Sequence, residues 1–199
     1  IDDVSDFFFF LKEGLKQGAE LPQEYLIPSH YINAIRELYN YERRYRDVVT
    51  LAEKVLENHR TVDKLVIREI RYWMCLALAR LRDSRFYQEV RELGEIEREF
   101  VYGFYYRLIG KYENAVQCLI RVLEMKPDHY RAKSELVQSY LNSQQYEKAY
   151  SLARENYLID KNNPYNLYSF IRCLISIKDT TNKDEIIRLI YELGKSSQP

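Results

Sequence analysis

The sequence contains little glycine and proline, with six and five of these residues among 199. Both residues interrupt helices, so their scarcity favours an all-helical protein. The three cysteines, Cys75, Cys118 and Cys173, are far apart and form no C-x-x-C motif. An odd and scattered set predicts buried free thiols in a reducing compartment rather than a disulfide framework. We therefore expect a cytoplasmic protein.

The chain has no excess of charge, because thirty basic residues balance thirty acidic ones. Such a balance gives no general attraction to nucleic acid or to an anionic membrane, and we expect neither as a partner. The apolar run at residues 7–11 is far shorter than the roughly 20 residues that span a bilayer. It also lacks the basic flank and cleavage site of a signal peptide. Because the sequence starts at Ile1, we expect a piece of a longer protein.

Patterns that carry catalysis or bind metals and cofactors are missing as well. None of the three histidines, His30, His59 and His129, has a second histidine or a cysteine at ligand spacing. There is no glycine-rich phosphate loop and no G-x-S-x-G elbow. The many carboxylates lie within polar stretches of predicted helices, which is typical of solvated faces. We therefore predict a protein without cofactor, metal or catalytic residues, which is not an enzyme.

What the sequence does contain is an internal repeat. Between residues 95 and 129, Gly110 is placed to end one helix, and Pro127 prevents the next helix from continuing. Gly103 and Ala115 are small residues that allow the two helices to approach closely. A second unit follows at an offset of 34 residues. Its matching positions are Leu136, Tyr140, Tyr146, Ala149 and Ala153, in place of Tyr102, Tyr106, Tyr112, Ala115 and Leu119.

These residues resemble the tetratricopeptide repeat, a helix-turn-helix unit of 34 residues. Gly103, Tyr106, Ala115 and Pro127 match the small, aromatic, alanine and proline positions of that family. Upstream, Trp73, Leu76 and Ala77 resemble its W-x-x-L-G/A opening. The resemblance implies an all-α array of antiparallel helix pairs that forms a right-handed superhelix, with about 9–11 helices in a chain of this length.

The spacing predicts a domain division with about five repeats. Residues 1–28 form a leading helix and linker, which is either separate or the end of a preceding repeat, and residues 195–199 form a frayed tail. The unit that contains Trp73 has a long first helix, over about 61–81, and a short second one. The predicted repeats span 29–60, 61–94, 95–129, 130–163 and 164–194.

In this family the first helix of each pair lines a concave groove, and the resemblance implies which residues face it. Aromatic and arginine side chains are the types that most often anchor interfaces. For Phe100 and Phe104 two interpretations stay open, since each ring either binds a partner or fills the seam to the neighbouring repeat. Tyr165 and Ile175 occupy groove positions too. The candidate partner-binding residues are Phe100, Phe104, Arg107, Arg131, Gln138, Tyr168 and Arg172.

The resemblance implies a non-catalytic scaffold that binds a protein or peptide in this groove. The alternative is the sensor or regulatory C-terminal segment of a larger bacterial signal-transduction ATPase (STAND type) or defence protein. A weaker alternative is RNA binding by the helical repeats. The clamp with which some relatives hold chaperone carboxylates is not expected, because its basic positions are occupied by Phe100, Phe104, Ser134 and Gln138. The sequence predicts no oligomeric state.

Overall fold

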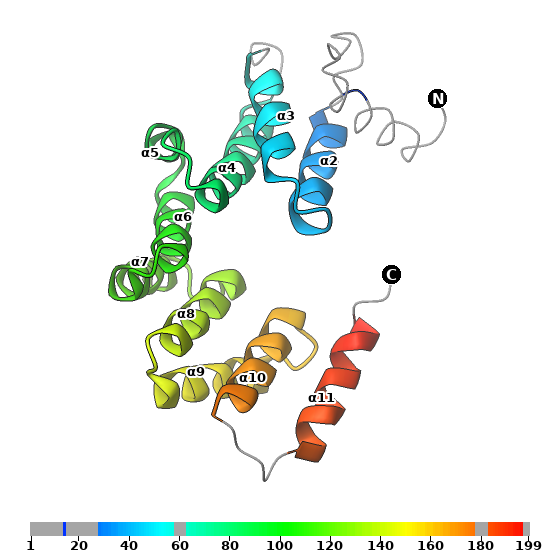
Figure 1. Ribbon diagram of the computed structural model, residues 1–199, viewed down its shortest axis with the longest axis vertical. Helices are drawn as coiled ribbons and strands as arrows, with labels where there is room; N and C mark the ends of the chain where they lie inside the picture. Colours follow the sequence, from blue (N-terminus) through cyan, green and yellow to red (C-terminus); the bar gives the residue numbers. More distant parts are fainter. Residues whose placement is uncertain (1–13, 15–27, 58–62, 178–182, 197–199) are drawn as a thin grey trace. The chain divides into compact units, whose positions relative to one another are not determined.

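The structure is a computed structural model that describes residue 14 and residues 28–57, 63–177 and 183–196. Every regular element within these residues is a helix, as Figure 1 shows, and they include ten α-helices, so the predicted all-α class is confirmed. The predicted leading helix and linker, residues 1–28, lie outside the described residues except for residues 14 and 28. By its contacts the chain divides into two compact units, residues 1–101 and 102–199, and the boundary falls inside α6 (Glu95–Leu108).

Unit 1 consists of helices that each contact the next one along the chain. Helices α2 and α3 pack together, and both contact α4. After α4 come a single-turn helix, α5, and a 3₁₀ turn, η3, in place of a full second helix. This agrees with the long first helix and short second element expected around Trp73. The bounds are α2 (Pro28–Asn40), α3 (Tyr45–Glu57), α4 (Lys64–Leu81), α5 (Phe86–Glu89) and η3 (Val90–Glu92).

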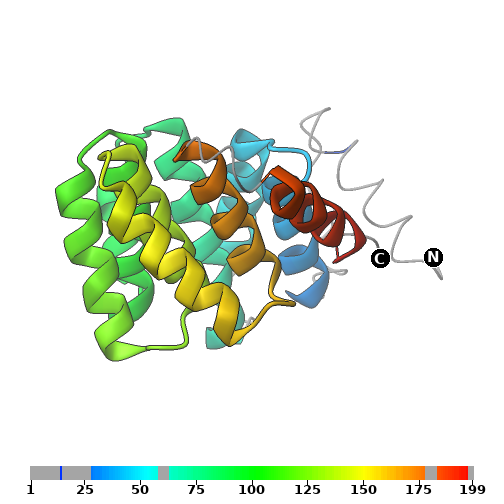
Figure 2. The same cartoon turned by 90° about the horizontal axis from the view of Figure 1, so that it is seen from below.

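Unit 2 continues with regular helix pairs. Helix α8 contacts α7, α9 and α10, and α10 also contacts α9 and α11. Figure 2 shows α9, α10 and α11 side by side in chain order. We call α2, α4, α6, α8 and α10 the first helices, and the helix that follows each of them its second helix. The bounds are α7 (Tyr112–Met125), α8 (Tyr130–Asn142), α9 (Tyr146–Ile159), α10 (Pro164–Ser176) and α11 (Lys183–Ser196).

Side chains just outside several helices satisfy the free amides of the first turn. The Asp63 carboxylate accepts from the Leu65 amide at 2.7 Å, at the start of α4. Asn163 does the same for α10, where Pro164 takes the first helical position and needs no hydrogen-bond acceptor. At α8 the imidazole of His129 accepts from the Ala132 amide at 3.1 Å. These caps explain why the helices begin where they do.

The turns inside successive helix pairs share one backbone conformation. A residue with positive φ follows α2, α4, α6 and α8, and these residues are Arg43 (φ 54°), Arg82 (φ 55°), Gly110 (φ 80°) and Gln144 (φ 60°). The prediction that Gly110 ends its helix in the left-handed region is confirmed. Gln144 is in register with Gly110, so the second repeat uses the same turn without the glycine.

Small residues allow the close approach of paired helices, as the sequence predicted. A Cβ atom on Gly103 would lie 2.8 Å from Cγ of Leu119, which belongs to α7. Ala115 and Ala149 are fully buried at the matching positions of α7 and α9. A larger side chain at any of these three positions would therefore require the helices to move apart.

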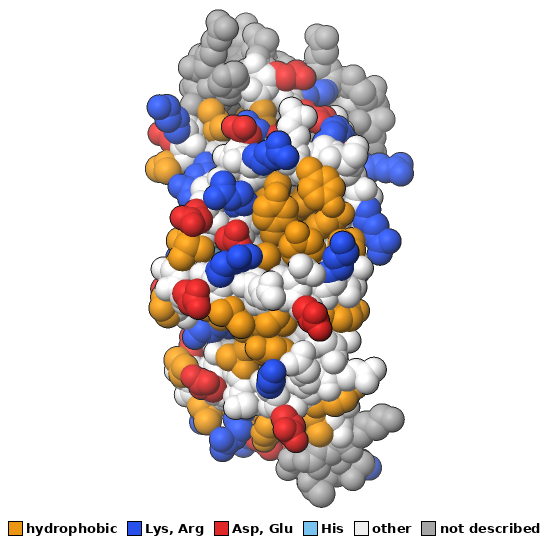
Figure 3. Space-filling view, turned by 90° about the vertical axis from the view of Figure 1, so that its left-hand side faces the viewer, with side chains coloured by type: hydrophobic (Ala, Val, Ile, Leu, Met, Phe, Trp, Pro, Cys, Tyr) orange, Lys and Arg blue, Asp and Glu red, His pale blue; other side chains and the backbone are white. Residues whose placement is uncertain are grey.

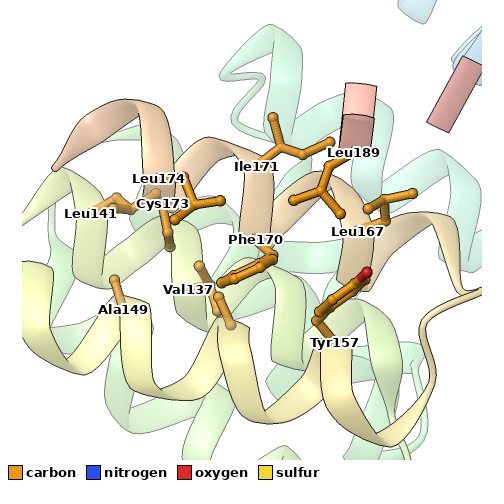
Figure 4. Close-up of a cluster of buried hydrophobic side chains, with 11 residues drawn as sticks. Val137, Leu141, Ala149, Tyr157, Leu167, Phe170, Ile171, Cys173, Leu174 and Leu189 are labelled. Carbon is orange, nitrogen blue, oxygen red and sulfur yellow. The ribbon is translucent and has the colours of Figure 1, made fainter. Parts of the chain in front are cut away.

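A hydrophobic cluster holds α8 to α11 together (Figure 4). The ring of Phe170 from α10 stacks on Tyr157 from α9, with centroids 5.0 Å apart. Leu189, which is fully buried, is the contribution of α11. The members are Val137, Leu141, Ala149, Ala153, Tyr157, Leu167, Phe170, Ile171, Cys173, Leu174 and Leu189.

The C-terminal helix is longer than expected. Helix α11 continues through Ser196, whereas the sequence predicted a frayed tail from residue 195 onward. Gly194 does not end the helix, because it is not among the glycines with positive φ. None of the helices in the described residues is long and apolar enough to cross a membrane.

Candidate partner-binding surface

Arginine–glutamate pairs connect consecutive first helices. Each pair occupies side chains that could otherwise contact a binding partner. An exposed pair contributes less than about 1 kcal/mol to the stability of the fold. Arg107, one of the predicted binding residues, is engaged in this way, and its guanidinium also lies 5.5 Å from the centre of the Phe104 ring. The pairs are Arg36–Glu69 between α2 and α4, Arg68–Glu97 (2.5 Å) between α4 and α6, and Arg107–Glu135 (2.5 Å) between α6 and α8.

Hydroxyl and aromatic contacts connect α8 to α10 instead. The hydroxyl groups of Ser134 and Ser169 share a hydrogen bond of 2.8 Å. At the start of the two helices the rings of Tyr130 and Tyr165 lie 5.1 Å apart, and both remain more than 40% exposed. Because Tyr130 was not among the predicted groove residues, this exposed aromatic pair extends the candidate surface. The sequence signal for this pair is that Tyr130 and Tyr165 are separated by nearly one repeat length.

Phe100 and Phe104 are buried, with 1% and 3% of their surface exposed. In unit 1 the ring of Phe100 lies 6.2 Å from that of Tyr72 on α4. In unit 2 Phe104 lies beneath the guanidinium of Arg107. Burial of this degree favours the interpretation that both rings fill helix seams. A partner could contact either ring only if the neighbouring helices moved apart.

Two of the predicted residues on α8 are partly or largely covered. Gln138 is only 8% exposed, and within the described residues its amide nitrogen has no hydrogen-bond acceptor. Arg131, one position after Tyr130, is half-buried. The groove positions of α8 therefore offer less surface than the resemblance implies, because α10 packs against this helix.

Tyr168 and Arg172 on α10 are the predicted residues that lie together at the surface. Tyr168 is 44% exposed, and Nη1 of Arg172 donates to its hydroxyl at 3.2 Å. The guanidinium carbon lies 5.8 Å from the centre of the ring, so the arginine is held over the aromatic face. Among the described residues no carboxylate pairs with Arg172. Ile175, one turn further, is 54% exposed and extends this row.

In unit 1 the C-terminal part of α2 borders a shallow hollow. Its volume is about 480 Å³, and it is open to solvent. A hollow this open favours a peptide surface over an enclosed small-molecule site. The lining residues are Asn33, Arg36, Glu37, Asn40 and Tyr41.

The described residues offer little for catalysis or metal binding. They contain no group of three or more His, Cys, Asp or Glu side chains placed to hold a metal ion. Burial raises the pKa of Cys75 and of Cys173 to about 12, so both thiols stay protonated at neutral pH. Protonated, buried thiols are poor nucleophiles, and these cysteines act as core residues.

The charge on the surface is mixed. Figure 3 shows a face on which patches of hydrophobic side chains alternate with acidic and basic ones. On this face there is no continuous basic area of the kind that follows a nucleic-acid backbone. The mixed character agrees with the zero net charge of the sequence.

Comparisons with known proteins support the fold. A family model for subunit 3 of the anaphase-promoting complex, or cyclosome, matches residues 109–181. The solved structure "MamA RS-1 ArsTM double mutant" is similar, with a TM-score of 0.56 and 19% identity over 84% of this chain and 97% of that one. "MamA MSR-1 C2" matches with a TM-score of 0.51 and 16% identity, over 87% and 99%. The search of curated proteins gives no match.

These matches support the fold class. The fold is a helical solenoid of the tetratricopeptide type, and the resemblance of the sequence to that family is confirmed. Solenoids of stacked helix pairs present extended surfaces to other molecules, which is the usual basis of their function. The predicted division into five repeats and the handedness of the superhelix stay predictions.

Proposed function

We propose that the chain is a non-catalytic scaffold that binds a peptide or protein segment across the first helices of its repeats. The exposed row on α10 carries this proposal. Tyr168, Arg172 and Ile175 combine an aromatic face, a cation and an aliphatic side chain within three turns of one helix. Tyrosine and arginine are enriched among the residues that dominate binding energy at interfaces.

The same row indicates the chemistry of the partner. Arg172 is fixed in orientation by Tyr168 and has no carboxylate partner among the described residues. A planar guanidinium in that position can bind a carboxylate through two hydrogen bonds. Tyr130 and Tyr165 extend the surface with two further exposed rings. We expect a segment with an acidic residue next to apolar ones.

The test is affinity capture from a native lysate, identified by mass spectrometry. The variant Tyr168→Ala/Arg172→Ala removes the aromatic ring and the cation of the row without touching a buried side chain. Its matched control, Tyr146→Ala/Arg154→Ala, removes the same residue types from the exposed side of second helix α9. A partner that the α10 variant loses and the control retains supports the proposal. Partners held equally by both variants contradict this site, and capture of RNA lost at high salt contradicts a protein scaffold.

The predicted alternative, a sensor segment of a larger signalling ATPase, would also bind its ligand through the first helices of the repeats. No contact or charge among the described residues favours it over a scaffold, and it stays a prediction.

A further inference from the structure

Three exposed tyrosine rings lie together on α8 and α10. Tyr130, Tyr165 and Tyr168 are 46%, 42% and 44% exposed, and we call them the tyrosine platform. The rings of Tyr130 and Tyr165 lie 5.1 Å apart. A further ring inserted between them would need about 7 Å, since it contacts both faces. The two rings therefore present one joint surface to a partner, and Tyr168 lies one turn further along α10.

The tyrosine platform is shallow, because more than two-fifths of each ring stays exposed. Each residue of a partner buries little apolar area on such a surface, so the contact offsets little of the entropy that a flexible chain loses when it becomes ordered. A segment that is already extended in solution loses less. The polyproline II helix is such a conformation, and proline-rich segments that adopt it dock on aromatic side chains.

The polar groups beside the platform are mainly hydrogen-bond donors. Gln138 lies 34 residues before Arg172, so it has the equivalent position on the preceding first helix. Its amide nitrogen is buried and has no acceptor within the described residues. The terminal amide turns about a torsion with broad minima, which allows the nitrogen to be directed at a bound chain. A proline-rich segment fits these donors, because its carbonyl groups make no internal hydrogen bonds and proline has no N–H.

The charges of α8 and α10 favour an acidic residue in that segment. Arg172 is the only charged residue of α10. In α8 the carboxylate of Glu135 pairs with Arg107, and the other charged residues are Arg131 and Lys133. The turn before each helix carries one acidic and one basic residue, which are Asp128 with Lys126 and Asp160 with Lys161.

The charges of α11, which packs on α10, do not change this balance. Arg188 lies within 4.0 Å of both Glu185 and Glu192. Lys195 lies over the ring of Tyr191, at 4.6 Å from its centre, and the adjacent Lys183 and Asp184 cancel each other. Arg172 therefore stays the cation that a partner meets beside the tyrosine platform.

The spacing along α10 matches the repeat of a polyproline II helix. Tyr165 and Arg172 are seven residues apart, and in an α-helix this places them on one face about 10.5 Å apart. In polyproline II, residues three positions apart share a face and are separated by about 9.3 Å. A proline on the joint surface of Tyr130 and Tyr165 thus brings the third residue from it close to Arg172, with Tyr168 beneath the residues between.

On the basis of the scaffold function proposed above, we propose that the tyrosine platform binds a proline-rich segment in the polyproline II conformation. One proline lies on Tyr130 and Tyr165, and Arg172 binds the carboxylate of an acidic residue three positions from it. Gln138 donates a hydrogen bond to a main-chain carbonyl of the same segment.

Fluorescence anisotropy of labelled synthetic peptides, titrated with the full chain, tests the proposal. The probe peptide consists of prolines on both sides of one aspartate. A second peptide has alanine in place of every proline, and a third has asparagine in place of the aspartate. We expect the probe to bind, and each replacement to raise its dissociation constant by about tenfold. Failure of the probe to bind overturns the proposal, as does equal binding of the proline and alanine peptides.

Variants of the chain assign the contacts. Tyr165→Leu keeps an apolar side chain but loses the aromatic face, and should weaken binding of the probe about tenfold. Tyr146→Leu is the matched control, since it removes a 40% exposed ring from α9, and should leave binding unchanged. Arg172→Gln should bind the aspartate and asparagine peptides equally. An Arg172→Gln variant that still prefers the aspartate peptide contradicts the assigned position of the acidic residue.

Gln138→Met separates a binding role from a structural one. It replaces a buried donor that lacks an acceptor with an apolar side chain of similar length, so the urea midpoint should stay the same or rise. Binding of the probe should nevertheless weaken several-fold. Unchanged binding in this variant overturns the role of Gln138. Circular dichroism confirms that each variant keeps its helix content.

Failure of this proposal can be distinguished from failure of the scaffold function. If the probe does not bind, but the Tyr168→Ala/Arg172→Ala variant still loses a partner captured from the lysate, the scaffold function stands and the proline-rich chemistry is wrong. If the probe does not bind and that variant retains every captured partner, both proposals are wrong.

Discussion

Gln144 occupies a left-handed backbone position that its repeat counterpart fills with glycine. Its φ of 60° matches the 80° of Gly110. A residue with a Cβ atom costs roughly 1–2 kcal/mol in this conformation, whereas glycine adopts it freely. We expect Gln144→Gly to raise the free energy of unfolding by about 0.5–1 kcal/mol, after the added entropy of glycine in the unfolded chain is subtracted.

The reciprocal change provides the control. Gly110→Gln should lower the free energy of unfolding by about 1 kcal/mol. The space around a Cβ atom at Gly110 is open. The loss of stability therefore measures the cost of the backbone conformation and not a steric clash. Urea denaturation followed by circular dichroism measures both variants. Two changes of the same sign would contradict a shared turn conformation.

His129 makes the start of α8 sensitive to pH. Its Nδ1 accepts from the Ala132 amide, which requires a neutral imidazole, and burial lowers the pKa of His129 below its usual 6.5. Well above pH 6.5 the side chain is neutral in both the folded and unfolded states, and the cap is fully present. As the pH falls below that value, the unfolded chain takes up the proton first, so the folded state loses stability.

The variant His129→Asn keeps a good capping side chain and removes the titration. We expect the urea midpoint of the natural chain to fall more than that of the variant between about pH 7.5 and about pH 5.5. The difference between the two falls isolates His129 from the other titrating groups. Equal falls would show that this histidine does not couple protonation to folding.

At the scale of the helix pair, close packing depends on Ala115 and Ala149. Both are fully buried in second helices, and the carbonyl oxygen of Ala115 lies 3.4 Å from a Cβ atom built on Gly103. Replacing either alanine with leucine should overpack the pair and cost about 1–3 kcal/mol, although leucine is itself a good helix former. The exposed neighbour Asn114→Leu is the control and should cost much less. An unchanged midpoint in both alanine variants would contradict the repeat alignment.

The helix pairs could be predicted from sequence because their determinants are local. The spacing of Gly103, Gly110 and Ala115 within one unit predicts a close pair and the turn that joins it, and the structure confirms both. The second unit has the same spacing, but Gln144 stands where the first unit has glycine. The turn there is therefore predicted by the 34-residue offset and not by the residue type.

The surface was less predictable, because exposure depends on neighbours distant in sequence. Phe100 and Phe104 occupy groove positions by the resemblance, yet neighbouring side chains cover both rings. The ion pair of Arg107 with Glu135 joins two different helices. The sequence alone does not say which of the many carboxylates nearby will pair with Arg107. Tyr168 and Arg172 are exposed, and their mutual contact follows from four-residue spacing on one helix.

At the scale of the whole molecule, stability should be local, because each helix of an array contacts its neighbours in sequence. Leu189 is the fully buried residue by which α11 joins the cluster around Phe170. In such arrays stability is approximately a sum of repeat and nearest-neighbour terms. Leu189→Ala should cost about 2–5 kcal/mol at the C-terminal end, with little effect on α2, α3 and α4.

Hydrogen exchange of the backbone amides measures this locality. In Leu189→Ala we expect faster exchange in α10 and α11 and unchanged exchange in α2 to α4. The reciprocal variant is Ile35→Ala, which removes a fully buried side chain from α2 and should speed exchange there while leaving α10 and α11 protected. If either variant instead speeds exchange evenly along all described helices, the chain unfolds as one cooperative body. Local opening of α11 would then be too costly to occur by itself, and the nearest-neighbour description of this array would be wrong.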